Sequence, residues 1–275
     1  MESRLWPGAV GLRRESWTGD GFACAVHTRR ESSGVISKHG ACLAFEGYLI
    51  DFPEGRPVLD RLLDGFLEHG PAFLERLNGS FQIVVHHDGK TRVFADPTGS
   101  RRLFYVTDET AERGLFLAPE MGPLIDLRRG EAIDRANLVQ FLVSGRFFAG
   151  QSLLPWVRQV LPGESLLWRD GRLERHRYFL YEVSDGEERP GLLDELGNRV
   201  ERAVLRAAEH AESPIVLLSG GYDSRYIFHI LARSLDVPKR LRSMLWGERM
   251  EVPGSDNHAA EAVARQYGIE HLTLP

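Results

Sequence analysis

The stretch IVLLSGGYDSRYIF, residues 215–228, decides the fold of the second half of this chain. It begins with a run of four apolar residues, which predicts a buried strand of the kind found in parallel sheets. Two glycines and several polar residues follow, and then apolar residues recur at helical spacing. In open α/β sheets, ligands bind outside the carboxyl ends of the strands. The sequence therefore predicts a ligand-binding loop at residues 219–224.

The residue types in this loop suit the pyrophosphate end of ATP. Gly220 and Gly221 allow backbone N–H groups to approach an anion closely, and the N-terminus of the following helix favours negative charge at the same place. Ser219 and Ser224 can donate hydroxyl hydrogen bonds to phosphate oxygens, and Asp223 can bind the Mg²⁺ that bridges phosphates. The loop matches neither GxxxxGK[ST] nor GxGxxG. The alternative is a structural Gly-Gly turn in which Asp223 or Ser224 caps the helix.

Strands and helices alternate after residue 191. A helix is expected where Leu193, Leu196, Val200 and Val204 share one face. Strands are expected at 214–219, 240–247 and 270–275, and further helices at 224–235 and 256–267. This alternation predicts right-handed βαβ crossovers and the first part of a doubly wound parallel sheet over residues 192–275, in the α/β class. The polar, turn-rich stretch 184–191 is the expected linker.

The first half of the chain has a different pattern, with short strands and tight turns typical of an α+β domain. The Asp-Gly pairs at 88–89 and 170–171 each predict a β-hairpin. One helix is expected between Pro57 and Leu77, where leucines recur three and four residues apart. A second is expected at 134–143, with Asp134 as its N-cap.

Composition and charge exclude several classes of function. The net charge is −5, with acidic and basic residues interleaved, which argues against a nucleic-acid surface. The two cysteines, Cys24 and Cys42, form no CxxC and have no histidine at ligand spacing, so we expect neither a zinc site nor a disulfide framework, as in a reducing cytosol. His86 and His87 lie beside a predicted turn, at an expected solvated edge. No apolar stretch is long enough for a signal-peptide core or a membrane span, so we expect a cytoplasmic protein without membrane contact.

The order of the motifs resembles that of a known family. Ser219-Gly220-Gly221-Tyr222-Asp223-Ser224 is similar to the PP-loop of N-type ATP pyrophosphatases. Upstream, LNGSFQIVVHHDGKTRVFADPTGSRRLFY (77–105) resembles the asparagine synthetase family, in which an LNG-F segment precedes D-x-x-G-x-(R/K)-x-L-(F/Y)-Y. Further segments follow in the family's order: FLAPEMGPLID (116–126), AIDRANLVQFLVSG (132–145), LPGESL (161–166), RHRYF (175–179) and SDNHAAEAVARQYGIEHLTL (255–274). The resemblance covers roughly residues 40–275.

This resemblance implies a fold and a chemistry. Residues 1–183 would form a class II glutamine amidotransferase-like domain, an αββα sandwich of the Ntn type, and residues 192–275 the first part of an ATP-binding synthetase domain. Such a domain adenylates a carboxylate, releases pyrophosphate and lets an amine displace AMP. The resemblance implies pyrophosphate at Ser219, Gly220, Gly221 and Ser224, Mg²⁺ at Asp223, and adenine near Leu218 and Trp246. The alternative for Trp246 is a core position in the second strand.

The sequence departs from the family's amidotransferase pattern in three places. An Ntn glutaminase uses an N-terminal cysteine whose α-amine is the general base, whereas this chain begins Met-Glu-Ser at 1–3. Where the family has Asn-Gly-Glu-(I/L)-Tyr-Asn for the oxyanion hole, this chain has FEGYLID (45–51), with Glu46 in place of asparagine. An arginine-glycine-proline-aspartate segment is absent. Cys24 would become N-terminal only if residues 1–23 were removed, which we do not expect.

We therefore expect a first domain without glutaminase activity. The same profile occurs in β-lactam synthetases and in the cyclases of lasso-peptide clusters, which adenylate a carboxylate and use an amine already in the substrate. The favoured interpretation is ATP-dependent amide-bond formation. The alternative is a catalytically incomplete fragment or binding module whose Ntn-like domain docks a peptide or a partner protein. A tRNA-modifying PP-loop enzyme is disfavoured by the acidic charge and by the Ntn-like first half.

No catalytic residue is assigned from the sequence. The chain ends at Pro275, before the late catalytic residues of the family. A small-molecule or peptide carboxylate is the expected substrate. A further copy of the chain, or a partner chain, is expected to complete the synthetase domain.

Overall fold

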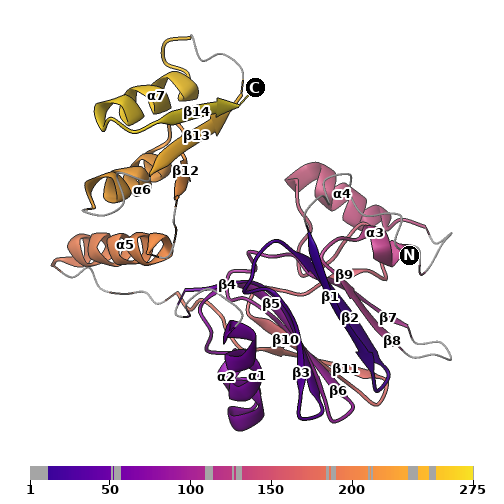
Figure 1. Cartoon of the computed structure of the whole chain (residues 1–275). Coiled ribbons are helices and arrows are strands. Elements are labelled where there is room, and N and C mark those ends of the chain that lie inside the picture. Colours follow the sequence, from indigo (N-terminus) through magenta and orange to yellow (C-terminus); the bar gives the residue numbers. More distant parts are fainter. Residues whose placement is uncertain are drawn as a thin grey trace. The chain divides into compact units, whose positions relative to one another are not determined.

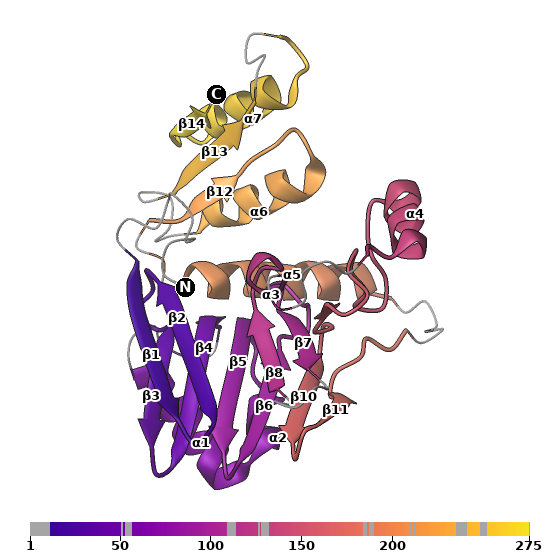
Figure 2. The same cartoon turned by 90° about the vertical axis from the view of Figure 1, so that its right-hand side faces the viewer.

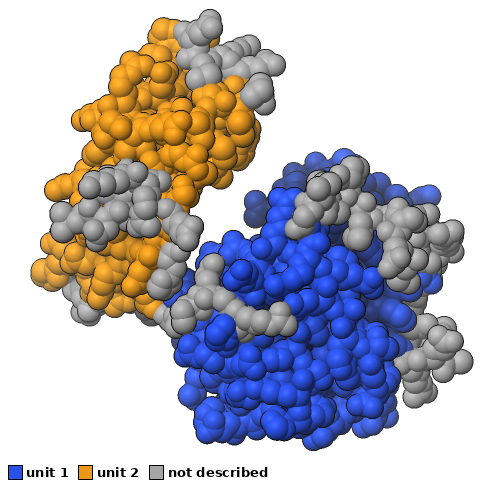
Figure 3. All heavy atoms as spheres, viewed as in Figure 1, with its two compact units in different colours: residues 1–183 blue, residues 184–275 orange. Residues whose placement is uncertain are grey.

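The computed structural model describes residues 12–50, 52, 57–108, 114–125, 127, 132–183, 186, 190–209, 211, 213–234, 241–247 and 252–274. The chain divides into two compact units, residues 1–183 (unit 1) and residues 184–275 (unit 2) (Figure 3). The division falls where the expected linker begins, and most of 184–191 lies outside the described residues. In the described part of the chain, no helix is long and apolar enough to cross a membrane.

Unit 1 is built on a six-stranded antiparallel sheet in the order β11-β10-β6-β5-β4-β3, with two smaller sheets, β1-β2 and β8-β7-β9. Asp-Gly turns join β5 to β6 and β10 to β11, and both residues of each turn have positive φ, so the two predicted hairpins are confirmed. The elements of unit 1 are β1 (Arg13–Gly19), β2 (Phe22–Thr28), β3 (Gly34–Lys38), β4 (Ala41–Leu49), α1 (Pro57–His69), α2 (Pro71–Leu74), β5 (Gly79–His87), β6 (Lys90–Ala95), β7 (Phe104–Asp108), β8 (Gly114–Ala118), α3 (Gly122–Ile125), α4 (Arg135–Ser144), β9 (Arg158–Gln159), β10 (Glu164–Arg169) and β11 (Arg172–Arg177).

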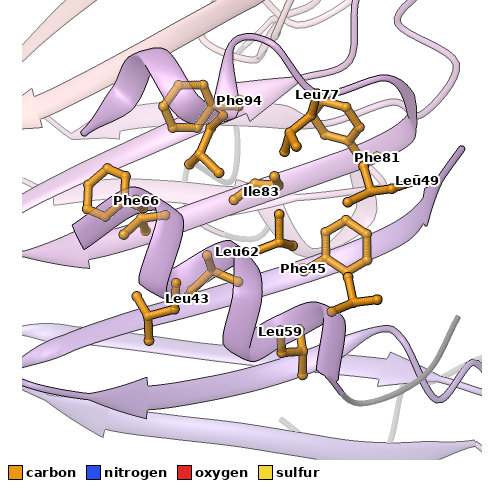
Figure 4. Packing of buried hydrophobic residues seen from close by; sticks show 14 of the residues in the cluster. Leu43, Phe45, Leu49, Leu59, Leu62, Phe66, Leu77, Phe81, Ile83 and Phe94 are labelled. Atoms are coloured by element: carbon orange, nitrogen blue, oxygen red, sulfur yellow. The ribbon is translucent and has the colours of Figure 1, made fainter. Parts of the chain in front are cut away.

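Alternating side chains of the strands fill three cores, and these define the layers of unit 1. Phe94 of β6 belongs to the core that the six-stranded sheet forms with α1 and α2, whose packing Figure 4 shows. Its neighbour Val93 belongs to the core on the opposite face, together with Tyr105 of β7. Val106 then points out of the second sheet and packs with Leu124 of α3. The layers are therefore helix, sheet, sheet, helix (Figure 1), as expected for an αββα sandwich.

The helix predicted between Pro57 and Leu77 is confirmed by α1, but it does not continue to Leu77. Helix α1 ends at His69, and α2 begins at Pro71. Gly70, between them, has φ +69, which no α-helix accommodates. Proline also disfavours a helical conformation in the residue before it, so the Gly70-Pro71 pair breaks the helix despite its continuous apolar spacing.

Helix α4 begins as predicted but packs differently from an ordinary surface helix. The carboxylate of Asp134 accepts hydrogen bonds from the backbone N–H groups of Ala136 and Asn137 at 2.9 and 3.0 Å, so the predicted N-cap is confirmed. The side chains of Leu142 and Val143 are 73% and 83% exposed, although both are strongly apolar. Within the described residues, α4 therefore has an apolar surface that no side chain covers.

His86 corrects another expectation, because it is buried rather than at a solvated edge. It is 6% exposed, and the Phe22 ring from hairpin β1-β2 stacks on it with centroids 4.8 Å apart. Its Nδ1 lies 2.9 Å from the Thr91 hydroxyl, and burial lowers the pKa of the imidazole. The sequence around His86 gives no sign that a distant hairpin covers this end of the sheet.

Unit 2 is a three-stranded parallel sheet in the order β12-β13-β14 with helices between its strands (Figure 2). Its elements are α5 (Leu192–Ala208), β12 (Ile215–Leu217), α6 (Tyr222–Arg233), β13 (Arg242–Trp246), α7 (Asp256–Gln266) and β14 (His271–Leu274), which confirms the predicted alternation. One face of the sheet, including Val216, packs with Phe228 of α6 and Ala260 of α7. A doubly wound sheet requires the strand order to reverse. The described strands follow each other across the sheet in chain order, without a reversal. The doubly wound topology therefore stays a prediction.

The opposite face of the unit 2 sheet is apolar and exposed. Ile215 and Leu217 alternate with the buried Val216 and are 43% and 50% exposed. On the neighbouring strands, Trp246 is 58% and Leu274 is 48% exposed, and these two residues are register partners. No helix of the described part of unit 2 packs on this face, because its helices contribute to the core on the other side.

Candidate functional site

The loop at 219–224 leaves the carboxyl end of β12 and enters α6, as the sequence predicts. The hydroxyl of Ser224 accepts a hydrogen bond from the Ser219 N–H at 3.1 Å and lies 3.0 Å from the Ser219 hydroxyl. The Ser219 hydroxyl in turn accepts from the Gly221 N–H at 3.2 Å. Hydrogen bonds of the two serines therefore fix the backbone of the loop on both sides of its glycines.

The two glycines do not have equivalent surroundings. A Cβ at Gly220 would lie 2.5 Å from Oδ1 and 3.3 Å from Cα of Asp256, whereas at Gly221 it would meet only the Ser219 hydroxyl at 3.3 Å. Asp256 is the first residue of α7, which follows the neighbouring strand β13. Asp256 has no local sequence signal that links it to the loop. The carboxyl ends of adjacent parallel strands share one edge of a sheet, which is the pattern that predicts its position.

The loop offers donors for an anion. Within the described residues, the backbone N–H groups of Gly220, Tyr222 and Asp223 have no hydrogen-bond partner, as is usual in the first turn of a helix. Arg225 adds a positive charge, since its Nε donates to the Gly221 carbonyl at 3.2 Å and its guanidinium lies over the Tyr222 ring. Unpaired amides, a helix N-terminus and a fixed cation fit a phosphate group.

Asp223 is exposed in the first turn of α6, so its carboxylate is accessible to a metal ion. Among the described residues there is no cluster of three or more histidine, cysteine, aspartate or glutamate side chains that could hold a metal. Mg²⁺ commonly binds to one or two carboxylates together with phosphate oxygens and water. Asp223 therefore fits a Mg²⁺ that arrives with a nucleotide.

Leu218 and Trp246 border this loop in different ways. Leu218 is fully buried in the unit 2 core, and its N–H donates to the Met244 carbonyl at 3.0 Å. Its side chain is therefore turned away from any ligand at the loop, and only its backbone could contact one. Trp246 ends β13 and is 58% exposed, so the alternative of a core position is wrong. Its ring is available to an aromatic ligand at the edge where the loop begins.

The second candidate site is at Glu46 and Gly47 of β4, which the family resemblance aligns with an oxyanion hole, and the structure has a salt bridge there. Glu46 on β4 accepts a hydrogen bond from the guanidinium of Arg101 at 2.9 Å, across 55 residues of chain. Arg101 also donates through Nε to the carbonyl of Ser80 at 3.3 Å. The carboxylate is thus held by an internal cation. An oxyanion would meet a paired carboxylate in place of an amide donor.

The neighbouring backbone amide is also engaged. The Gly47 N–H donates to the Ser33 hydroxyl at 3.1 Å, and that hydroxyl lies 3.3 Å from the Gly47 carbonyl, so it can donate back to it. Gly47 has φ +137, and a Cβ there would lie 2.1 Å from the carbonyl oxygen of Ser80, so glycine is required. Ser33 is fully buried. Sequence reasoning missed this contact because nothing local connects residue 33 to β4.

A buried aspartate orders the loop that carries Arg101. The Asp96 carboxylate accepts from the N–H and hydroxyl of Thr98 at 2.9 and 2.6 Å, and from the Ser100 hydroxyl at 2.7 Å. Burial raises the pKa of Asp96, but these hydrogen bonds outweigh it and hold the pKa below its usual value. The carboxylate also accepts from the Phe81 N–H at 3.3 Å. This network fixes the D-x-x-G-x-R segment as a scaffold for the Glu46–Arg101 pair.

Cys24 does not occupy a terminal position in the structure. It lies in the middle of β2 and pairs with Trp17 of β1 in an antiparallel register that includes all residues of both strands. Removal of residues 1–23 would delete β1 and unpair β2. The expected nucleophile position at 1–3 lies outside the described residues.

Comparison with known proteins identifies one part of the chain. Residues 59–179 match the family model described as a glutamine amidotransferase domain. The match covers less than half of the chain and lies within unit 1, which is therefore called the amidotransferase-like unit below. No curated protein matches the chain. The match includes the Asp96 network and Arg101, and it begins after Glu46 and Gly47.

Two solved structures are similar at a low level. One is glutamine phosphoribosylpyrophosphate amidotransferase from B. subtilis in complex with ADP and GMP, with 16% identity and a TM-score of 0.32, over 86% of this chain and 46% of that one. The other is described as the allosteric regulatory enzyme of purine biosynthesis, with 15% identity and a TM-score of 0.31, over 86% of this chain and 45% of that one. This chain thus spans about half the length of the structures it matches. At these TM-scores the likeness carries no argument about the site.

Proposed function

We propose that the chain belongs to an ATP-dependent amide-forming system of the asparagine synthetase type, in which unit 2 binds Mg·ATP and a carboxylate is adenylated for attack by an amine. The observation that carries the proposal is the loop at 219–224, with its unpaired N–H groups at the N-terminus of α6. An amidotransferase-like unit precedes it in the same chain. A loop suited to phosphate and an amidotransferase-like unit in one chain support this proposal.

In this proposal the loop supplies binding and charge. The N–H groups of Gly220, Tyr222 and Asp223 would donate to phosphate oxygens, and the Ser219 and Ser224 hydroxyls would keep the loop closed around them. Mg²⁺ would be held by Asp223 and would neutralise charge on the leaving pyrophosphate when bound. The exposed indole of Trp246 would stack against the base.

The amine is not proposed to come from glutamine hydrolysis in unit 1. Neither position offers a free donor to an oxyanion: Glu46 is a carboxylate paired with Arg101, and the Gly47 amide donates to Ser33. The amine would therefore come from the second substrate or from the same molecule as the acid. Unit 1 keeps the layers of the fold and would serve as a docking or scaffolding domain.

The test of this function is ATP–pyrophosphate exchange by the full chain with Mg²⁺ and a panel of carboxylic acids. Exchange that depends on one acid would support adenylation, because only acyl-adenylate formation returns labelled pyrophosphate to ATP. Glutamate release from glutamine is measured in parallel and should stay at the level of a blank. If the chain binds Mg·ATP but no acid in the panel supports exchange, adenylation by this chain is rejected. The proposed nucleotide site would not be affected by that result.

Binding is tested separately by calorimetry with Mg·ATP. Asp223→Asn should weaken binding roughly 10- to 100-fold, since loss of one charge-assisted contact costs about 1.5–3 kcal/mol. Asp194→Asn is the matched control, because Asp194 is also an exposed aspartate in the first turn of a helix, α5. Equal affinity of wild type and Asp223→Asn would show that the loop is only a turn with a helix cap.

The alternative function is that of a binding module, and exposed apolar surface favours it. Two exposed apolar surfaces have the character of interaction sites: Leu142 and Val143 on α4, and the uncovered face of the unit 2 sheet. If Mg·ATP does not bind and a peptide or protein partner binds to the whole chain, a binding-module function replaces the proposed enzymatic function.

A further inference from the structure

The two cysteines of the chain lie against each other. They are 18 residues apart in sequence, yet their sulfur atoms are 3.9 Å apart in the structure. Cys24 is the third residue of β2, and Cys42 is the second residue of β4 in the six-stranded sheet. Both thiols are free. The contact therefore joins the β1-β2 hairpin to the sheet that it covers.

The two thiols differ in accessibility and in neighbours. Cys24 is partly exposed, whereas Cys42 is 1% exposed. Cys42 is the register partner of His86 on β5, so the imidazole is directly opposite it in the sheet. Phe22, two residues before Cys24, stacks on the same imidazole. The pair thus has one partly accessible thiol and one that is almost completely buried.

We propose that Cys24 and Cys42 are a hydroperoxide-reactive thiol pair that closes to an intramolecular disulfide and ties the β1-β2 hairpin to the six-stranded sheet. An S–S bond is about 2.05 Å long, so the sulfur atoms must approach each other by about 2 Å. In this proposal, rotation about χ1 of the partly exposed Cys24 brings its sulfur towards Cys42.

The chemistry balances with one hydroperoxide per disulfide. The Cys24 thiolate attacks the distal oxygen of the peroxide, the O–O bond breaks, and an alkoxide or hydroxide leaves and takes up the thiol proton. The Cys42 sulfur then attacks the sulfenic sulfur of Cys24. The S–O bond breaks, and the departing hydroxide takes the proton of Cys42 as water. Two thiols are oxidised and one peroxide is reduced to an alcohol, or to water.

The electrostatics of the pair agree with this order of events. The hydrogen bond from Cys42 lowers the pKa of Cys24, although burial opposes it. The same interaction, together with burial, raises the pKa of Cys42. Thiolate is the reactive form, so Cys24 reacts first and Cys42 resolves it.

The disulfide would have a structural consequence next to Gly47. The loop that it closes runs from β2 through Ser33 to β4, and Ser33 holds the backbone of Gly47. In the reduced chain this hairpin is tied to β3 by the Glu15 carboxylate, which accepts from the Val35 N–H at 2.9 Å. A covalent bond would add a constraint that denaturant and thermal opening cannot break. Hydrogen exchange of residues 13–28 should therefore slow on oxidation and return to its former rate on reduction.

The experiment titrates the reduced full chain with hydrogen peroxide and follows intact mass. Wild type should lose the mass of two hydrogens and both of the thiols that maleimide labels after denaturation, and dithiothreitol should restore them. Cys42→Ser should instead accumulate a sulfenic acid on Cys24 that dimedone traps. Cys24→Ser should leave Cys42 unreacted. The control is Ala25→Cys in a Cys24→Ala background, which keeps two thiols but places one on the opposite face of β2.

Three results would overturn the proposal. The first is wild-type chain that gains oxygen on Cys24 without losing two hydrogens. The second is wild-type chain in which both thiols stay reduced while the same peroxide oxidises the denatured chain. The third is an intramolecular disulfide in the Ala25→Cys control, because the pairing would then not depend on the observed contact.

Discussion

Ser33 should stabilise the amidotransferase-like unit through its two contacts with Gly47, and an adjacent serine provides the control. Its hydroxyl accepts from the Gly47 N–H at 3.1 Å and can donate to the Gly47 carbonyl, 3.3 Å away. Ser32 is also buried, at 3% exposure, but within the described residues its hydroxyl has no hydrogen-bond partner. Ser33→Ala and Ser32→Ala therefore remove the same atom from neighbouring buried positions, and only the first breaks hydrogen bonds.

The expected cost follows from what each substitution leaves behind. Ser33→Ala strands a buried N–H and a buried carbonyl of Gly47, and a buried polar group without a partner costs about 1–3 kcal/mol. Partial rehydration reduces the sum, so we expect the free energy of unfolding of unit 1 to fall by about 2–4 kcal/mol. Ser32→Ala removes a hydroxyl that already lacks a partner. It should leave that free energy unchanged or raise it by less than about 1 kcal/mol.

Urea unfolding followed by tryptophan fluorescence measures both variants. The Trp246→Phe background removes the one tryptophan after residue 183, so the remaining signal reports unit 1. A fall of less than about 0.5 kcal/mol for Ser33→Ala, or equal falls for the two variants, would refute the reasoning, since surface-like substitutions already reach that size. The Gly47 backbone would then have another partner in solution.

Three further predictions concern separate parts of the chain. Burial lowers the pKa of His86, so below the ordinary histidine pKa of about 6.5 the unfolded chain binds more protons than the folded chain. The unfolding free energy should therefore fall as the pH drops below that value, and His86→Phe should flatten the dependence of the urea midpoint on pH. An unchanged slope in the variant would contradict this. Gly220→Ala should lower the thermal midpoint of unit 2, because its Cβ would press on Asp256, while Gly221→Ala should not; equal midpoints would contradict it. Val143→Lys should change the unfolding free energy by less than about 0.5 kcal/mol, since the Val143 side chain is 83% exposed. The same change should reduce self-association of the chain in sedimentation velocity, and unchanged association would show that α4 is not a contact surface.

Local patterns in the sequence predicted local structure well. The Asp-Gly turns have positive φ at both positions, as their hairpins require, and Asp134 caps α4 because its carboxylate reaches amides two and three residues away. The break between α1 and α2 could also have been predicted, since Gly70-Pro71 is a helix-ending pair, but the leucine spacing on both sides masked it. Interactions within a few residues are readable because the chain itself sets their distance.

Contacts across long stretches of chain could not be predicted. Glu46 pairs with Arg101 over 55 residues, and His86 is buried by a hairpin whose Phe22 is far from it in sequence. The Phe22–His86 contact depends on which face of the sheet each strand presents, and a one-residue change of register would separate the two rings. The Glu46–Arg101 contact depends on where the loop after β6 folds. The position of Asp256 is partly predictable. Its position beside Gly220 follows from the parallel order of β12 and β13, once that order is known.

The internal partners of the oxyanion position indicate how glutaminase chemistry would be lost in such a unit. A change of asparagine to Glu46 alone would leave an unpaired carboxylate next to the Gly47 amide, and that amide would remain free. In this chain Arg101 neutralises the carboxylate and the Ser33 hydroxyl takes the amide, so both groups now stabilise the fold. Glu46→Asn by itself would restore one donor but release Arg101 beside it and leave the amide occupied. An oxyanion site would return only if the Ser33 contact were removed as well, and that removal carries the stability cost argued above. A free amide at Gly47 and the stability of the unit are therefore coupled through the Ser33 contact.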